Sequence, residues 1–237
     1  MPDLLSVFEP SPNDAVAVAV AAAAEPAVRK RPKPGERRVQ ILQALATMLE
    51  QPGAERVTTS ALAARLEVSE AALYRHFASK AQMFEGLIEF IEQSVFTLVN
   101  QISDREPEPA ARTRKLVVMV LQFAEKNPGL TRVMVGDALV FENERLQERM
   151  NQFFDKLESI LKQNMRDAAT AAGDATPSIS ARVKASVITA FMVGRIQRFS
   201  RSGFRRLPSE YLDASLTALL DGGVPCNQIE AEKWDLL

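Results

Sequence analysis

Residues 58–80 read Thr58-Thr59-Ser60-Ala61-Leu62-Ala63-Ala64-Arg65-Leu66-Glu67-Val68-Ser69-Glu70-Ala71-Ala72-Leu73-Tyr74-Arg75-His76-Phe77-Ala78-Ser79-Lys80. Hydroxyl side chains at Thr58 and Ser69 are suited to cap two short helices, the second of which is predicted to run from Glu70 to about His76. Each helix is too short and too poor in apolar residues to be stable alone, so both must pack on neighbouring helices. The residues predicted to face inward are Leu62, Leu66, Val68, Leu73 and Phe77.

The other side chains of this stretch form an outward face with the chemistry of nucleic-acid recognition. Small residues at Ala71 and Ala72 let a helix approach base edges closely, and a second helix of this size fits the major groove of DNA. Hydroxyl, tyrosine and basic side chains at the margins suit phosphate oxygens. The residues predicted to face outward or sideways are Thr59, Ser69, Glu70, Ala71, Ala72, Tyr74, Arg75 and His76.

The sequence on both sides predicts an all-helical chain. Upstream, apolar residues at three- and four-residue spacing predict an amphipathic helix from about Glu36, ended by Pro52-Gly53. Downstream, Ser79 and Gln82 match a capping box that opens a long helix. Further helices are predicted at about 109–126, 130–135, 138–170, 180–202 and 208–221. No alternating run of β-branched residues joined by a tight turn is present, so no sheet is expected.

The charge distribution points to a single polyanion-binding module. The whole chain has a net charge of −1. Residues 1–28 contain four acidic residues and no basic one, whereas residues 29–80 contain ten Lys or Arg against five Asp or Glu. A locally basic segment on a nearly neutral protein favours nucleic-acid binding by that segment over a generally adhesive surface.

The side chains that enzymes and metal sites need are scarce or scattered. The chain has one cysteine, Cys226, and one histidine, His76, which argues against a zinc site, a Cys/His nucleophile pair and an intrachain disulfide. No Gly-rich phosphate loop and no Gly-x-Ser-x-Gly elbow is present. We therefore expect no catalysis, no metal and no cofactor.

The uncharged run Ala15–Ala24 is the only candidate for a targeting or membrane segment near the N-terminus. It is short and weakly apolar, and no basic segment precedes it. We therefore expect neither a membrane span nor a signal peptide, and we predict a cytoplasmic protein.

The pattern Leu-Ala-x-x-Leu-x-Val-Ser-x-x-x-Leu-Tyr-x-His-Phe-x-x-Lys, from Leu62 to Lys80, resembles the DNA-binding domain of the TetR family. The resemblance implies an N-terminal helix-turn-helix domain, a helical C-terminal domain, about nine helices in all, and a homodimer that pairs through its last two long helices. It also implies that Tyr74, His76 and Lys80 contact DNA phosphates. One departure is Glu67, at a turn position that commonly carries glycine; a left-handed backbone there would cost on the order of 1 kcal/mol.

A narrower resemblance is to the SlmA-type nucleoid occlusion factors, a branch of the same family that binds palindromic chromosomal sites and antagonises the cell-division protein FtsZ. It is carried by residues 68–77, by Gly86-Leu87-Ile88-Glu89-Phe90-Ile91-Glu92 and by Asn127-Pro128-Gly129-Leu130-Thr131-Arg132. Leu98 stands where this branch would place an arginine, which weakens one electrostatic contact. The resemblance implies that the C-terminal tail of FtsZ binds a groove between the fourth and fifth helices, at Phe90, Met119, Gln122, Lys126 and Asn127.

Several positions keep a second interpretation. His76 is either a phosphate contact or a packing residue at a helix end, and Tyr74 either contacts phosphate or covers the edge of the core. Spacing alone makes Phe90 more typical of a core than of a binding surface. The apolar helix at 183–199 is either deep core or the subunit interface that the resemblance implies. A basic strip is either a solvated face or a partner of acidic helices: Arg195, Arg198, Arg201, Arg205 and Arg206.

These observations predict four parts. Residues 1–35 form a disordered extension whose basic end is either a solvated tail or a supplementary DNA contact, residues 36–82 the DNA-binding domain, residues 83–222 a helical domain for dimerisation and partner binding, and residues 223–237 a flexible tail. Base edges are predicted to be read by Glu70, Ala71 and Ala72, and the DNA backbone to be held by Thr58, Thr59, Ser69, Tyr74, His76 and Lys80.

The predicted function is nucleoid occlusion. A nucleoid-associated homodimer binds palindromic double-stranded DNA, with half-sites about 34 Å apart, and inhibits assembly of the FtsZ ring over the nucleoid. Two alternatives stay open: a purely architectural nucleoid protein without marked sequence preference, and a ligand-responsive TetR-type transcriptional repressor. In the repressor, five bulky residues would fill or line a small-molecule pocket: Phe123, Phe141, Phe153, Phe154 and Phe191.

Overall fold

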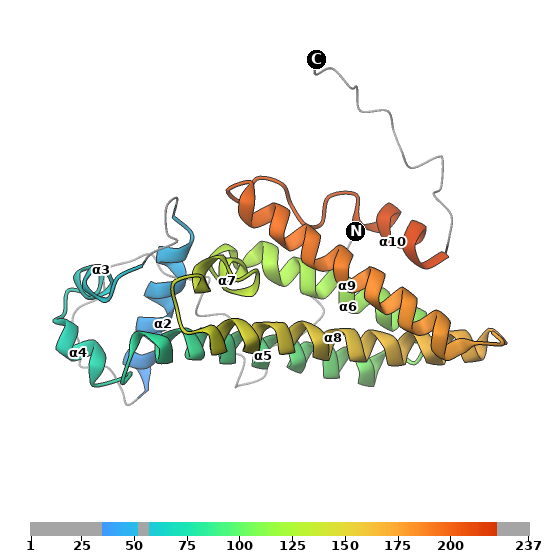
Figure 1. Ribbon diagram of the computed structural model, residues 1–237, viewed down its shortest axis with the longest axis horizontal. Coiled ribbons are helices and arrows are strands. Elements are labelled where there is room, and N and C mark those ends of the chain that lie inside the picture. The colour runs from blue at the N-terminus through green and yellow to red at the C-terminus, as the bar shows by residue number, and fades with distance from the viewer. Residues whose placement is uncertain (1–34, 52–56, 222–237) are drawn as a thin grey trace, which may run out of the picture. The chain divides into compact units, whose positions relative to one another are not determined.

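The computed structural model describes residues 35–51 and 57–221. Within these residues there are nine α-helices, one short 3-10 helix and no β-strand (Figure 1). The prediction of an all-helical fold with about nine helices is confirmed. The elements are α2 (Glu36–Leu49), α3 (Thr59–Arg65), α4 (Glu70–Tyr74), α5 (Lys80–Arg105), α6 (Pro109–Lys126), α7 (Pro128–Met134), η2 (Asp137–Leu139), α8 (Glu144–Ala171), α9 (Pro177–Arg201) and α10 (Leu212–Asp221).

The described chain divides into two compact units. The first contains residues 35–51, 57–98 and 127–151, and the second contains residues 99–126 and 152–221. Four features of the sequence lie outside the described residues. They are the basic end of the predicted N-terminal extension at residues 29–34, Pro52-Gly53 after the first predicted helix, Gly222-Gly223 after the last one, and the C-terminal tail with Cys226. The boundary predicted at residue 82, between the DNA-binding domain and the dimerisation domain, stays a prediction. The two compact units are defined by packing and not by function, so they do not test it.

The first unit is built on α2, whose buried residues Ile41, Leu45 and Leu49 recur at four-residue spacing. This helix packs against α3 and α7, and α3 packs against α4. The two short helices, of seven and five residues, pack through Leu62 and Leu73, each 1% exposed. Full burial of such a side chain stabilises the fold by about 1.5–3 kcal/mol. These anchors explain how helices too short to form alone persist here.

Gly129 permits a close approach of α7 to α2. A Cβ atom at this position would lie 2.0 Å from the backbone carbonyl oxygen of Ala46 in α2. Pro128 occupies the first turn of α7, where its missing N–H leaves no helical hydrogen bond unmade. The sequence predicts Asn127-Pro128-Gly129 as a helix stop, and α6 does end at Lys126. The structure adds that Pro128 and Gly129 open the next helix and seat it on α2.

In the second unit, α9 packs against both α6 and α10. The side of α9 that faces these helices is buried through Ile188, Met192 and Ile196, all at most 1% exposed. The sequence left open whether this helix is deep core or interface. In the single chain it is core on one side only, because Val183 is 60% exposed and Val187 is 47% exposed.

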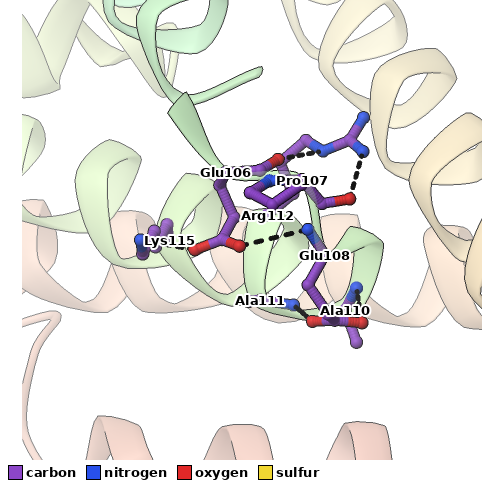
Figure 2. A network of polar contacts seen from close by, with 7 residues as sticks. All are labelled: Glu106, Pro107, Glu108, Ala110, Ala111, Arg112 and Lys115. Atoms are coloured by element: carbon purple, nitrogen blue, oxygen red, sulfur yellow. Dashed lines mark hydrogen bonds and ion pairs between the residues drawn. The ribbon is translucent and has the colours of Figure 1, made fainter. Parts of the chain in front are cut away.

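A capped corner begins α6 (Figure 2). The carboxylate of Glu108 accepts hydrogen bonds from the backbone N–H groups of Ala110, at 2.9 Å, and of Ala111. Pro109 is the first helical residue, a position that proline favours. A carboxylate at this end also interacts favourably with the helix dipole. The start of α6 is therefore fixed by local chemistry.

Side chains of α6 hold the turn that precedes them (Figure 2). Arg112 donates from Nε to the carbonyl oxygen of Glu106 at 3.0 Å and from Nη2 to that of Pro107 at 3.2 Å. Lys115 forms an ion pair with Glu106, with 2.6 Å between Nζ and Oε2. The pKa of the Glu106 carboxyl is lowered, first by the hydrogen bond from Lys115 and then by one from the backbone N–H of Glu108.

The lowered pKa predicts a dependence of stability on acid. A carboxyl whose pKa is lower in the folded than in the unfolded chain stabilises the fold above the unfolded pKa, and this stabilisation is lost as the pH falls through the lower value. The Glu106 contribution is therefore complete at neutral pH and declines below about pH 4.5. Glu106→Gln should make unfolding midpoints, measured from about pH 6 to pH 3, less sensitive to acid. Lys115→Met should have the same effect; unchanged sensitivity in both variants would contradict it.

Several predicted helix boundaries are wrong. The helix predicted at 138–170 is two elements, η2 and α8, and the side chain of Asn143 between them accepts a hydrogen bond from the N–H of Arg145 at the start of α8. The last helix starts at Leu212, later than the predicted 208, after Tyr211 in a left-handed conformation. α9 starts at Pro177 and not at 180, and α4 ends at Tyr74 and not at His76.

The phenylalanines predicted to fill or line a ligand pocket do not share one environment. Phe123 and Phe153 are buried, and Phe153 packs edge-on against Phe154 with ring centroids 5.2 Å apart. Phe141 belongs to the first unit and is 65% exposed, so it does not line an interior pocket of the second unit. The five residues are therefore not a single pocket lining.

Candidate nucleic-acid interface

Three side-chain caps build the helix-turn-helix, and all three positions were predicted. Thr58 Oγ1 accepts a hydrogen bond from the N–H of Ala61 at 3.1 Å, and Ser69 Oγ accepts one from the N–H of Ala72 at 3.3 Å. Ser79 Oγ caps α5 by accepting from the N–H of Gln82 at 3.2 Å. The side chain of Gln82 reaches back to the N–H of residue 78, one residue earlier than an ideal capping box. Each cap stabilises its helix by about 1 kcal/mol.

The turn between α3 and α4 contains a left-handed non-glycine residue. Glu67 has φ 52°, the conformation for which the sequence predicted a penalty. The turn closes through hydrogen bonds from the N–H of Glu67 to the carbonyl of Ala64, at 3.1 Å, and from the N–H of Val68 to the carbonyl of Ala63, at 3.0 Å. These bonds and the buried anchors of both helices offset the strain.

In residues 58–77, the burial of most side chains agrees with the predicted inward and outward faces. Leu62, Leu73 and Phe77 are each 1% exposed, whereas Leu66 and Val68 are only half-buried. On the other side Ala72 and Thr59 are half-buried, and Tyr74 is 45% exposed, which favours its interpretation as a contact residue. The other exposed positions of the face are Ser69, Glu70, Ala71, Arg75 and His76. The second helix therefore presents a narrow surface of small and polar side chains.

Glu70 is linked to the preceding helix. Thr59 Oγ1 donates a hydrogen bond to Glu70 Oε2 at 2.7 Å. Both side chains belong to the predicted DNA-contacting set, and this bond joins α3 to α4 at the exposed surface. Glu70 keeps the second oxygen of its carboxylate as a possible acceptor for a base amino group.

Arg38 is a site residue that sequence reasoning missed. It extends from α2, and its Nη1 donates to the backbone carbonyl of His76 at 3.0 Å. Its guanidinium also lies 4.1 Å from the centroid of the Phe77 ring, a cation–π contact. The only signal was a basic residue in the first turns of the first helix, which does not reveal a contact 38 residues away. Arg38 thus holds the end of the recognition helix to α2.

Lys80 has a partner within the fold. Its Nζ lies 2.5 Å from Glu142 Oε1 and 5.7 Å from the centroid of the Phe84 ring. The Lys80 side chain is 27% exposed, so it remains accessible at the surface where it begins α5. The resemblance to the TetR family implies a phosphate contact for this residue, and nothing in the sequence indicates its acidic partner.

The five residues predicted to bind the tail of FtsZ are divided between the units. Phe90 and Asn127 belong to the first, and Met119, Gln122 and Lys126 belong to the second. Phe90 is half-buried and lines a small apolar hollow between α2, α5 and α7. Met119 is 6% exposed and Lys126 is exposed. The groove that these residues would share stays a prediction.

Comparison with known proteins identifies the fold and its branch. Residues 41–87 match the profile of bacterial regulatory proteins of the tetR family, and residues 108–221 match the SlmA-like, tetracyclin repressor-like C-terminal domain. Nucleoid occlusion factor SlmA of Aliivibrio fischeri is 50% identical over 184 residues, which cover 76% of this chain and 91% of that relative. The chain belongs to the SlmA family. SlmA of Idiomarina loihiensis is 48% identical over 178 residues, covering 75% and 90%.

Solved structures share the TetR-like fold at low identity. The fatty acid degradation regulator FadR of Bacillus halodurans superposes with a TM-score of 0.65 at 16% identity, covering 81% of this chain and 98% of that one. AibR, solved in complex with isovaleryl coenzyme A and operator DNA, has a TM-score of 0.61 at 16% identity and covers 76% and 96%. At such identities the likeness shows the fold alone.

Membership of the SlmA family confirms the predicted resemblance and the prediction that the chain is not an enzyme, because its relatives are nucleoid occlusion factors and TetR-type regulators.

Within residues 35–51 and 57–221, no helix is long and apolar enough to cross a membrane. In the same residues no three His, Cys, Asp or Glu side chains are grouped as a metal site would require.

Proposed function

We propose that the chain binds palindromic chromosomal DNA as a homodimer, associates in this way with the nucleoid in the cytoplasm, and inhibits FtsZ-ring assembly there. The observation that carries the proposal is the exposed face of α4, displayed by a capped helix that Leu73 anchors from behind. Identity of about half over most of the chain to SlmA proteins supports the link to nucleoid occlusion.

The α4 face supports contacts of two kinds. Ala71 and Ala72 are small enough for the helix to enter the major groove, and Glu70 can accept from a cytosine amino group. Thr58 and Ser69 use oxygen lone pairs for their caps, so each hydroxyl proton remains available to a phosphate oxygen. Thr59, Tyr74, His76 and Lys80 complete the set proposed to hold the DNA backbone. Such phosphate contacts should make affinity fall steeply with salt.

An exposed apolar stripe on α9 supports dimerisation. Ile179, Val183 and Val187 follow one another at four-residue spacing and are 66%, 60% and 47% exposed. They line one side of a hollow of about 720 Å³ between the ends of α8 and α9. Gly194, two turns further along α9, would meet no atom within 4 Å if it carried a Cβ. A mid-helix glycine without a packing role in the single chain is explained by the close approach of a second helix.

The dimer interface predicts a charge-insertion phenotype. Val183→Arg places a guanidinium in the apolar stripe, and burying two such unpaired charges across a two-fold axis is strongly unfavourable. We expect the molar mass measured by light scattering to fall from that of a dimer to that of a monomer. Val140→Arg, the same change at a valine that is 65% exposed in the first unit, is the control and should remain dimeric. A dimeric Val183→Arg variant would contradict the assigned interface.

One orphan polar atom supports a peptide-binding role near the predicted groove. The Oε1 atom of Gln122 is buried and finds no hydrogen-bond partner within the described residues. Buried acceptors are almost always paired, so an N–H of an incoming chain is a suitable partner. The exposed Lys126, one turn further along α6, supplies a positive charge. These features support the proposal that FtsZ is engaged through its tail.

The proposed function is tested by FtsZ sedimentation with and without a palindromic duplex. We expect the chain to reduce the sedimented polymer, more strongly when the duplex is present, because DNA loads the protein in its active arrangement. FtsZ lacking its C-terminal tail is the matched control and should polymerise undisturbed. Equal polymer with and without the chain would contradict FtsZ inhibition, and inhibition of the tailless protein would contradict the predicted groove.

A further inference from the structure

The ion pair between Lys80 and Glu142 connects the DNA-binding surface to a distant part of the chain. Lys80 is the first residue of α5, and Glu142 lies in the short segment between η2 and α8. Both belong to the first unit, and the atoms Nζ and Oε1 are 2.5 Å apart. The Glu142 side chain is only 10% exposed. A carboxylate so withdrawn from water interacts more strongly with its partner than a pair at an open surface does.

We propose that Glu142 competes with DNA phosphate for Lys80 and so limits the affinity of the protein for DNA. This inference rests on the proposed function, in which Lys80 contacts the DNA backbone. A lysine ammonium has three donors and can face a phosphate while it keeps Glu142. Moving Lys80 fully to the DNA, however, leaves Glu142 unpaired and nearly buried, which is unfavourable.

The competition acts on every DNA sequence alike. Phosphate contacts carry no sequence information, so a device that weakens one of them lowers non-specific and specific affinity together. A protein that must find a limited number of palindromes among many other sites benefits from weak non-specific binding, because base contacts then decide where it stays. Glu142 is thus an affinity-determining residue outside the DNA-contacting surface.

Two neighbouring ion pairs serve as internal controls. Arg145 pairs with Glu85, and Arg149 pairs with Glu92, so that α5 and the start of α8 are joined by pairs of the same kind. None of these four residues belongs to the proposed DNA-contacting set. Glu85→Gln therefore removes a comparable carboxylate, at a similar place in the first unit, without releasing Lys80.

The test measures DNA binding of the full chain by fluorescence anisotropy, with a palindromic and a scrambled duplex over a series of salt concentrations. For Glu142→Gln we expect about fivefold tighter binding to both duplexes and a salt dependence steeper in log–log slope by about 0.9 per subunit, or about 1.8 for the dimer, because each Lys80 then contributes its full charge. Glu85→Gln should bind like the parent. In a Lys80→Met background, adding Glu142→Gln should change nothing, since its effect passes through Lys80.

Other results overturn the inference in distinct ways. Weaker binding by Glu142→Gln would mean that the carboxylate orients Lys80 for DNA, and unchanged binding would mean that the pair does not matter. A gain that persists in the Lys80→Met background would assign the effect to another group. Failure of the parent protein to bind either duplex at low salt would overturn the proposed function itself, together with this inference.

Discussion

Ala71→Glu is expected to weaken binding to a palindromic duplex by about a hundredfold or more. Ala71 is the second residue of α4 and is exposed on the face proposed to enter the major groove. The substitution fills the space needed for close approach and adds a carboxylate next to Glu70, between two rows of phosphates. The fold should survive, because acidic residues near a helix N-terminus are favourable and the position buries nothing.

The measurement is a binding titration at constant salt, with the unfolding temperature of each variant recorded beside it. Ala172→Glu makes the same change at an exposed residue directly after α8 and should bind like the parent. An Ala71→Glu variant that is folded and binds the duplex with parental affinity would show that α4 does not enter the groove.

Gly129→Ala is expected to destabilise the protein by about 3 kcal/mol. The added Cβ would lie 2.0 Å from the carbonyl oxygen and 2.9 Å from the carbonyl carbon of Ala46. Both atoms belong to the backbone of α2, which cannot move aside as a flexible side chain can. α7 must therefore shift away from α2, and the contact between them loosens beneath the helix-turn-helix.

Gly86→Ala is the matched control. A Cβ at Gly86 would meet the two terminal methyl groups of Leu42 at 3.1 Å, and these can rotate away. The gain in helix propensity from glycine to alanine offsets part of that strain, so the net change should stay within about 1 kcal/mol. Denaturant unfolding of both variants gives the comparison. Equal stabilities for the two would mean that the Gly129 contact is not tight.

The local parts of the interface were predictable from sequence, because their physics is local. The caps at Thr58, Ser69 and Ser79 involve partners three residues away, and the burial of Leu73 and Phe77 follows from apolar spacing. Even the left-handed Glu67 was recognisable as a departure from glycine at a turn.

The remaining features depend on contacts that spacing does not encode. Arg38 meets the His76 carbonyl across 38 positions, and Glu142 meets Lys80 across 62. Gly129 was interpreted as part of a helix stop, whereas its lack of a side chain serves a contact with α2 that only the fold brings about. Phe141 was grouped with pocket residues because of its size, yet it is largely exposed.

The central claim is that DNA binding by this chain marks the nucleoid as a region where division is inhibited. Mapping the bound sites across the whole chromosome in dividing cells tests it most directly. We expect many scattered palindromic sites that are absent around the replication terminus, and loss of all of them in cells that carry Ala71→Glu. Binding confined to a few sites upstream of one transporter gene would contradict the claim and favour a ligand-responsive repressor.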